Sequence, residues 1–217
     1  MLQVLTDTLI FPPVNLALED GLLAIGGDLS MERLLLAYRS GIFPWFNEDE
    51  LPMWWCPDPR FVLFPDELRE SKSMKQFARN SSLDFRIDTA FEEVIRSCQA
   101  VKRQGQDGTW ITREIMHSYT ALHNAGYAHS AEAWRDGKLV GGLYGIRLGR
   151  IFFGESMFST AANASKFAFI HYVKQLQREG VVLIDCQVYT QHLESLGARM
   201  ISRDHFIRLL KSNLSED

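Results

Sequence analysis

The segment VVLIDCQV, residues 181–188, carries two polar side chains, Asp185 and Gln187, in an otherwise apolar run. Because side chains alternate along a strand, these two would project from the same face and their neighbours from the other. A carboxylate in so apolar a setting loses hydration and needs hydrogen-bond donors or a cation. The pattern therefore predicts either an acid and an amide that act together on a substrate, or a structural acid that caps a loop or pairs with an arginine.

The segment GESMFS places a second acid, Glu155, directly after the apolar run Ile151, Phe152 and Phe153. In a regular strand Glu155 would share a face with Met157. A single glutamate at a strand end is most often an exposed residue. Two acids among apolar neighbours on adjacent elements nevertheless favour a common site.

Four tryptophans, Trp45, Trp54, Trp55 and Trp110, stand in the segments FPWF, MWWCPDPR and GTWITR, in loops or at element ends. We do not expect rings at such places to be simply part of the core. An exposed ring can stack on a nucleic-acid base, which contributes about 1 to 3 kcal/mol. Packing between domains is the alternative, and the sequence leaves both open.

Motifs of several other enzyme classes are missing from the sequence. The six histidines form no His-x-x-x-His pair, and there is no Gly-x-Ser-x-Gly elbow, Walker loop or Gly-x-Gly-x-x-Gly turn. Cys56, Cys98 and Cys186 lie far apart and outside any Cys-x-x-Cys motif, so we expect neither disulfides nor structural zinc. Metal-dependent hydrolysis, serine hydrolysis, ATP use and dinucleotide redox chemistry therefore lose support.

Charge is distributed unevenly along the chain, whose formal net charge is -4. Residues 1–50 carry two basic and eight acidic side chains, residues 51–115 ten of each, and residues 116–217 eleven basic and nine acidic. The net acidity argues against a general nucleic-acid coat protein, which needs an excess of Lys and Arg. A polyanion would dock on the later part. The basic segment with Lys72, Lys75 and Arg79 is either a phosphate contact or a solvated helix face.

The composition indicates a folded protein without a membrane span. Apolar residues make up 46% and charged residues 23% of the 217 positions, which is typical of a folded domain. No uncharged apolar run approaches the ~20 residues that cross a bilayer, and the N-terminus lacks the basic start of a signal peptide. We therefore expect a cytoplasmic protein with no membrane partner.

Helix and strand signals predict an α+β fold. We expect helices over about 31–41 with Ser30 as cap, over 71–80, from a cap at Asp88 to Gly105, and from Thr112 to Gly126. Residues 128–159 alternate and contain turn residues at Asp136-Gly137 and Leu148-Gly149, which predicts three antiparallel strands.

The remaining elements predict a mixed sheet with helices on its faces. We expect a helix over about 163–179, the strand 181–188, a short helix in TQHLESLG, a strand in ARMIS and a last helix in DHFIRLLKSN. Two prolines in WWCPDPR interrupt regular structure. We place a domain boundary there, giving a small N-terminal domain, 1–59, and a larger domain, 60–217.

Eight sequence blocks, taken together, identify a family. They cover nearly the whole chain in the order GLLAIGGDLS, GIFPWF, WWCPDPR, GTWITR, LVGGLYG, FFGESMFS, NASK and LIDCQV. In this order and at these separations the chain closely resembles bacterial leucyl/phenylalanyl-tRNA-protein transferases.

The resemblance implies an aminoacyltransferase that moves Leu or Phe, less readily Met, from aminoacyl-tRNA to the N-terminal Arg or Lys of a protein. That transfer marks the protein for degradation by the N-end rule pathway. The resemblance implies no ATP, metal or other cofactor. It also implies a small N-terminal domain followed by a GNAT-like domain, which is the fold of acyl-CoA N-acyltransferases.

The resemblance also assigns roles to residues that match the family's motifs. It implies a catalytic pair at Asp185 and Gln187, an acid near the acceptor at Glu155, and adenosine-binding rings at Trp45 and Trp110. The implied pocket for the aminoacyl side chain consists of Leu143, Phe152, Met157, Phe167 and Ile184. The family often has methionine where Leu143 stands, a change that conserves volume. Lys72, Lys75 and Arg79 are plausible contacts to the tRNA backbone.

Two other functions remain as alternatives. A GNAT-like N-acyltransferase that uses coenzyme A would share the order of strands and helices. It would normally need a glycine-rich pyrophosphate loop, and FGESMFSTAANASK has none. A non-enzymatic RNA-binding module would leave Asp185 and Gln187 without a use.

Overall fold

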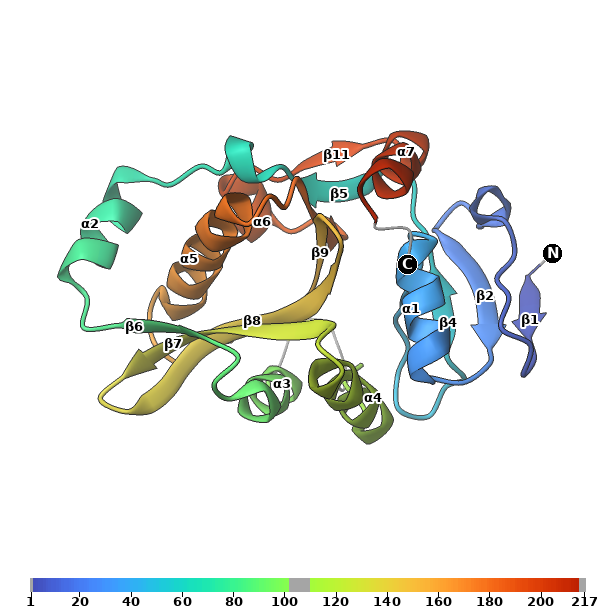
Figure 1. Cartoon of the computed structure of the whole chain (residues 1–217), viewed down its shortest axis with the longest axis horizontal. Coiled ribbons are helices and arrows are strands. Elements are labelled where there is room, and N and C mark those ends of the chain that lie inside the picture. The colour runs from blue at the N-terminus through green and yellow to red at the C-terminus, as the bar shows by residue number, and fades with distance from the viewer. Residues whose placement is uncertain (1, 102–109, 215–217) are drawn as a thin grey trace.

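Two β-sheets organise the chain, whose computed structural model describes residues 2–101 and 110–214 (Figure 1). The smaller sheet has the strand order β1-β2-β4-β3, and the larger has the order β11-β5-β10-β9-β8-β7-β6. In the larger sheet β9 and β10 are parallel, whereas β10 and β5 are antiparallel, as are β8 and β9. The predicted α+β fold with a mixed sheet is therefore confirmed.

The strands and helices of the described residues have the following bounds. The strands are β1 (Gln3–Leu5), β2 (Leu22–Gly26), β3 (Phe43–Pro44), β4 (Met53–Trp55), β5 (Arg60–Leu63), β6 (Asp84–Ile87), β7 (Ala128–Arg135), β8 (Lys138–Leu148), β9 (Ile151–Ser159), β10 (Leu183–Gln187) and β11 (Arg199–Ile201). The helices are α1 (Met31–Arg39), α2 (Lys72–Asn80), α3 (Phe91–Gln99), α4 (Arg113–Asn124), α5 (Ala164–Arg178), α6 (Gln191–Ser195) and α7 (Arg203–Asn213), with short 3-10 turns at Val14–Leu16 and Pro65–Glu67.

Helices cover both faces of the larger sheet (Figure 1). α5 packs on one face, where its apolar side chains join those of Leu143, Phe152 and Ile184 in one buried cluster. α3 and α4 pack on the other face, in a second cluster that also contains side chains of the smaller sheet and of α7. The larger core thus continues from the sheet into the N-terminal part of the chain.

The predicted meander of β7, β8 and β9 is confirmed. It could be predicted because the residues within a turn determine its conformation. Asp136 and Gly137 both have positive φ, 50° and 72°, as a type I′ hairpin turn requires. The predicted caps of α1 and α4 are also present: the side chains of Ser30 and Thr112 each accept a hydrogen bond from the backbone three residues later. Ser71, for which no cap was predicted, caps α2 in the same way.

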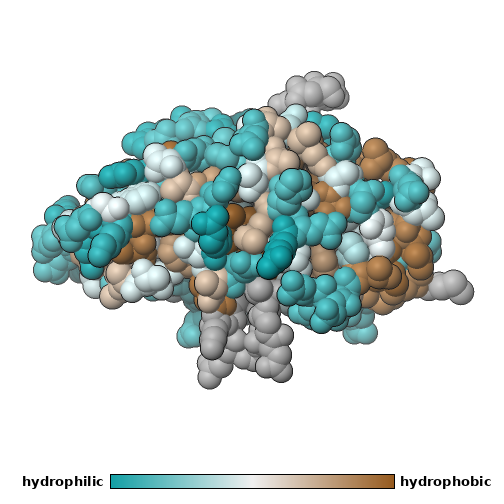
Figure 2. Space-filling view, turned by 90° about the horizontal axis from the view of Figure 1, so that it is seen from below, coloured by the Kyte–Doolittle hydropathy of each residue, from teal (hydrophilic) through white to brown (hydrophobic). Residues whose placement is uncertain are grey.

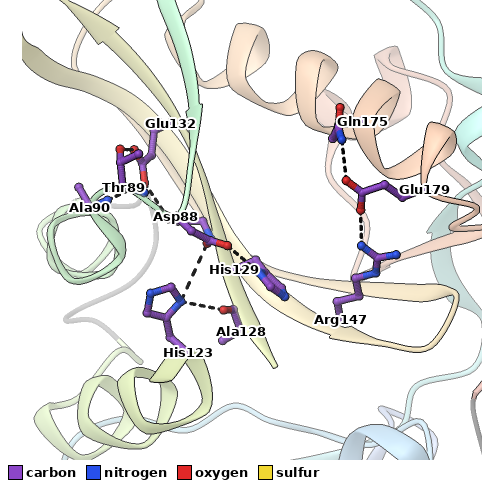
Figure 3. A network of polar contacts seen from close by, with 11 residues as sticks. Asp88, Thr89, Ala90, His123, Ala128, His129, Glu132, Arg147, Gln175 and Glu179 are labelled. Atoms are coloured by element: carbon purple, nitrogen blue, oxygen red, sulfur yellow. Dashed lines mark hydrogen bonds and ion pairs between the residues drawn. The ribbon is translucent and has the colours of Figure 1, made fainter. Parts of the chain in front are cut away.

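The predicted cap of α3 is wrong. Asp88 lies three residues before the helix, and its carboxylate accepts from the Ser130 backbone at 2.7 Å and contacts His129 (Figure 3). Glu132 of β7 instead holds the two residues just before the helix, because its Oε1 accepts from the backbone N–H groups of Thr89 and Ala90 at 2.9 and 2.8 Å. α3 ends at Gln99, and the expected stop at Gly105 lies outside the described residues.

Two bulges interrupt the alternation expected for the strands that carry the acids. On β9, Glu155 is an extra residue, since Tyr144 pairs with Ser156 and Gly145 pairs with Gly154. On β10, the pairing with β5 skips Cys186. The ladder between β9 and β10 runs only to Phe153 and Asp185, although both strands continue beyond it. Bulges bend strands and redirect side chains, and here both lie where the two strands stop pairing.

The N-terminal part of the chain carries the smaller sheet, which ends at Trp55 before the larger sheet begins at Arg60. Apolar surface gathers at this end of the molecule in Figure 2, and the first eighteen residues include the exposed side chains of Val4, Leu9, Ile10, Leu16 and Leu18. The division into domains at residue 59 stays a prediction.

Candidate active site

A cavity of about 410 Å³ opens where β9 and β10 diverge. Its apolar lining comes from Leu143 on β8, Met157 on β9, Phe169 on α5 and Ile184 on β10. Its polar lining includes Glu155 together with residues of β10 and α6. A few polar groups in a largely apolar cavity are typical of a small-molecule site.

Glu155 stands at the wall of this cavity in a ring of hydrogen-bond donors. Its Oε1 accepts from Gln187 Nε2 at 2.8 Å, and its Oε2 accepts from the Tyr119 hydroxyl at 3.1 Å. Burial raises the pKa of Glu155 to about 7, against the opposing effect of the nearby hydroxyls of Tyr38 and Tyr119 and of the Gln187 amide. The carboxyl group is therefore poised to exist in both protonation states near neutral pH.

Gln187 reaches Glu155 from an unusual backbone conformation. Its φ is 64°, in the left-handed region that residues other than glycine rarely adopt. Its backbone N–H donates to Asp185 Oδ1 at 2.9 Å, which helps to hold that conformation. Strained backbone of this kind is often found at functional sites.

Asp185 is not among the residues that line the cavity, and its catalytic role beside Gln187 stays a prediction. Its side chain is fully buried and forms two hydrogen bonds with Arg60, from Nε at 2.8 Å and from Nη2 at 2.7 Å. This is the arginine pairing that the sequence left open. The geometry makes Asp185 a support for the Gln187 backbone.

The implied pocket residues divide into two groups. Leu143, Met157 and Ile184 line the cavity, whereas Phe152 and Phe167 do not. The Phe152 ring packs on Tyr172 and lies against Gly145, where an added Cβ would come within 2.4 Å of Phe152 Cζ.

Phe169, which the sequence analysis did not name, lines the cavity where Phe167 was expected, and helical periodicity explains the difference. Ser165 and Phe169 line the cavity and lie four positions apart on α5, so they share one face. Phe167 lies between them in sequence and therefore on another face, where its ring contacts His171 at a centroid distance of 4.3 Å.

The tryptophans differ in how far they are buried. Trp45 is 37% exposed and its ring contacts that of Trp55. Trp54 and Trp110 are buried in the larger core, with 0% and 7% exposure. The expectation that rings at these places are not core is wrong for these two, and the adenosine-binding roles of Trp45 and Trp110 stay predictions.

The basic residues of α2 lie far from the N-terminal sheet, at the opposite end of the molecule (Figure 1). Lys72, Lys75 and Arg79 are all exposed. Among residues 2–101 and 110–214, no group of three or more His, Cys, Asp or Glu side chains could hold a metal ion. Within the same ranges, no helix has the length and apolar character needed to cross a membrane.

Sequence reasoning missed three polar residues around the site. Tyr38 and Tyr119 stand on α1 and α4, and their places in the sequence give no sign that they approach Glu155. Arg60 precedes the apolar segment FVLF. A cation bordering an apolar strand was the available signal for a partner to Asp185.

Comparison with known proteins places the chain in a family. Residues 62–211 match the leucyl/phenylalanyl-tRNA protein transferase family, and residues 27–58 match the N-terminal domain of the same family. The chain is 56% identical over 207 residues to the leucyl/phenylalanyl-tRNA-protein transferase of Chromobacterium violaceum, covering 94% of this chain and 88% of the relative. The identity is 57% over 204 residues with the enzyme of the same name from Flavobacterium johnsoniae, covering 94% and 96%.

Solved structures similar to the chain include two GCN5-related N-acetyltransferases. That from Anabaena variabilis has a TM-score of 0.46 at 12% identity, covering 84% of this chain and 44% of that one. That from Kribbella flavida has a TM-score of 0.40 at 9% identity, covering 77% and 60%. The extent of the sequence matches, rather than these weak structural ones, shows that the chain belongs to the leucyl/phenylalanyl-tRNA-protein transferase family, a family of aminoacyltransferases.

Proposed function

We propose that the chain moves Leu or Phe, and less readily Met, from aminoacyl-tRNA to the N-terminal Arg or Lys of a protein, in the cytoplasm. The modified protein is thereby marked for degradation by the N-end rule pathway. The cavity between β9 and β10 carries this proposal, because an apolar wall meets the polar pair of Glu155 and Gln187 inside it. Such a cavity accommodates an apolar side chain next to a reacting amine.

The donor needs little chemical activation. The ester between the amino acid and the terminal ribose already reacts with amines, so the protein's task is to hold amine and carbonyl in attack geometry. Correct positioning contributes about 7 to 11 kcal/mol to lowering a barrier in favourable cases. The wall of Leu143, Met157 and Ile184 holds the donor side chain and disfavours side chains branched at Cβ.

The acceptor meets the polar part of the cavity. Glu155 attracts the cationic Arg or Lys side chain, and that cation in turn favours the carboxylate form of Glu155. Gln187 orients the amine, because its side chain lines the cavity and its Nε2 is already directed to Glu155. As the C–N bond between amine and carbonyl forms, the ester C–O bond breaks, the amine loses a proton and the departing ribose oxygen gains one.

Asp185 acts on the substrate indirectly, through Gln187. It is fully buried against Arg60 and touches the Gln187 backbone, so its role is to fix Gln187 rather than to accept the proton. Trp45, which is partly exposed, and Trp110, which is largely buried, hold the terminal adenosine. Lys72, Lys75 and Arg79 contact phosphates of the tRNA without reading its sequence.

Transfer of radiolabelled leucine tests the proposal directly. Purified protein is mixed with leucyl-tRNA and a peptide that begins with Arg, and we expect label in the peptide. A peptide of the same sequence with an acetylated N-terminus should remain unlabelled, since its amine is blocked. Absence of label in the free peptide would refute the transferase activity, and transfer of acetyl from acetyl-CoA instead would support the acyl-CoA alternative.

A further inference from the structure

Two buried tyrosines extend the polar network of Glu155 away from the cavity. Tyr119 of α4 donates its hydroxyl proton to Glu155 Oε2 at 3.1 Å. The Tyr119 hydroxyl is also hydrogen bonded to the Tyr38 hydroxyl of α1. Both tyrosine side chains are fully buried, so the network lies in the core between the N-terminal part of the chain and the cavity.

The number of protons available determines which group is the donor in each hydrogen bond of this network. A tyrosine hydroxyl has one proton to donate, and that of Tyr119 is used by ionised Glu155. Tyr38 must therefore be the donor in its bond with Tyr119. Burial raises the pKa of both tyrosines well above the ordinary value, so both keep their protons. The result is a chain of donors that runs from Tyr38 through Tyr119 to one carboxylate oxygen, while Gln187 donates to the other.

Other charges around Glu155 do not replace these donors. Asp185 of β10 opposes ionisation of Glu155 through its own negative charge. Arg60 of β5 attracts the carboxylate, but it is ion-paired with Asp185, so the two charges act in opposite directions. The groups that most directly favour the carboxylate are the hydroxyls and the Gln187 amide, and they work against the desolvation of a buried acid.

We propose that Tyr38 and Tyr119 are positioning residues that hold Glu155 as a carboxylate at the cavity wall, ready to bind the cation of the acceptor. The inference rests on the proposed function, in which Glu155 receives that cation. Neither tyrosine lines the cavity, so they act on the acceptor only through Glu155. Because Tyr38 belongs to α1, the N-terminal part of the chain then contributes to the chemistry of a site formed by the larger sheet.

The decisive measurement is the titration of Glu155 itself. Protein labelled with ¹³C at glutamate carboxyl groups is titrated by NMR, and the Glu155 signal is assigned by its loss in Glu155→Gln. Tyr119→Phe removes the direct donor and should raise the midpoint by about one pH unit, a tenfold change in proton affinity. Tyr38→Phe should also raise it, because the Tyr38 hydroxyl donates to Tyr119 and favours the carboxylate form of Glu155.

Tyr189→Phe is the matched control. Tyr189 donates its hydroxyl to the surface carboxylate of Glu194 at 2.8 Å, so the same bond type is removed at another glutamate. We expect no change in the Glu155 midpoint for this variant. An unchanged midpoint in both Tyr119→Phe and Tyr38→Phe would overturn the inference, and Tyr38→Phe alone is decisive if Tyr119→Phe does not fold.

Binding of an acceptor peptide separates this inference from the proposed function. A peptide beginning with Arg is bound without any aminoacyl-tRNA, so that no reaction follows. At pH 7 Tyr119→Phe should weaken binding about fivefold, and the loss should disappear well above pH 8, where Glu155 ionises in both proteins. A raised midpoint with unchanged peptide affinity would uphold the tyrosine role and refute the acceptor role of Glu155.

Discussion

Asp185 and Arg60 are joined by two hydrogen bonds, and neither side chain is exposed to solvent. The Arg60 guanidinium lies between the rings of Phe43 and Phe206, at 4.7 and 4.6 Å from their centroids. One ring belongs to the smaller sheet and the other to α7. The ion pair therefore connects the strand that carries Gln187 to both of these parts of the molecule.

Breaking this ion pair should lower the free energy of unfolding of the protein. In Asp185→Asn the carboxylate charge is lost and Arg60 stays buried without an anion, which typically costs about 3 to 5 kcal/mol. We expect the urea midpoint to fall accordingly. Because the negative charge of Asp185 opposes ionisation of Glu155, its loss should also move the pH dependence of the remaining activity to lower pH.

An exposed pair of the same geometry provides the control. Arg199 forms two hydrogen bonds with Glu67 at 2.8 and 3.0 Å, and both side chains are open to solvent. Glu67→Gln should cost less than about 1 kcal/mol, as is usual for surface pairs. Equal losses in the two variants would contradict a special role for the buried pair.

The fold could be predicted from the sequence wherever its signals are local. Asp136 and Gly137 set a hairpin turn by their own conformations, and Ser30 caps α1 from three residues away. β5 was missed because four residues next to prolines show no period, and its partners on β10 lie more than 120 positions further along the chain. Strand pairing between residues so far apart in the sequence leaves no pattern in a short stretch of that sequence.

The site was predicted in its residue types but not in its geometry. The segments around Glu155 and Asp185 indicated acids among apolar neighbours, and the family resemblance implied an apolar pocket beside them. The two bulges could not be predicted, because a bulge is a difference in residue count between two paired strands. Those bulges decide that Gln187 rather than Asp185 lines the cavity with Glu155.

Removing the Glu155 charge should change how stability depends on pH. The pKa of Glu155 is about 7 in the folded protein and 4.5 in its ordinary state, so between these values the folded state holds a proton that the unfolded state has released. The free energy of unfolding of the wild type therefore falls as the pH rises through this window. Glu155→Gln has no such loss.

Urea denaturation at several pH values measures this difference. We expect the free energy of unfolding of Glu155→Gln, relative to that of the wild type, to increase by on the order of 3 kcal/mol between pH 4.5 and pH 8. The comparison at pH 4.5 is the internal control, since both proteins are then neutral at this position. A stability difference that does not vary with pH would show that burial does not disfavour the carboxylate.

Neutralising the basic face of α2 should flatten the salt dependence of tRNA binding. Each phosphate contact contributes about 0.7 to 0.9 to the slope of log affinity against log salt. Replacing Lys72, Lys75 and Arg79 by Gln should therefore lower the slope by about 2. The control replaces three other exposed cations, Arg96, Lys138 and Arg208, and an equal effect in that protein would refute a specific contact at α2.

Enlarging the cavity at Met157 should relax the selection of the donor amino acid. Met157 lines the apolar wall opposite Leu143, its partner in the β8–β9 ladder. Truncation to Ala makes room for side chains branched at Cβ, and selection by one methyl group is worth only about 1 to 3 kcal/mol. Transfer from isoleucyl-tRNA and valyl-tRNA should thus rise relative to leucyl-tRNA in competition assays. Met200→Ala removes an exposed methionine of β11 and should leave the ranking unchanged, so an unaltered ranking in Met157→Ala as well would mean that this wall does not contact the donor.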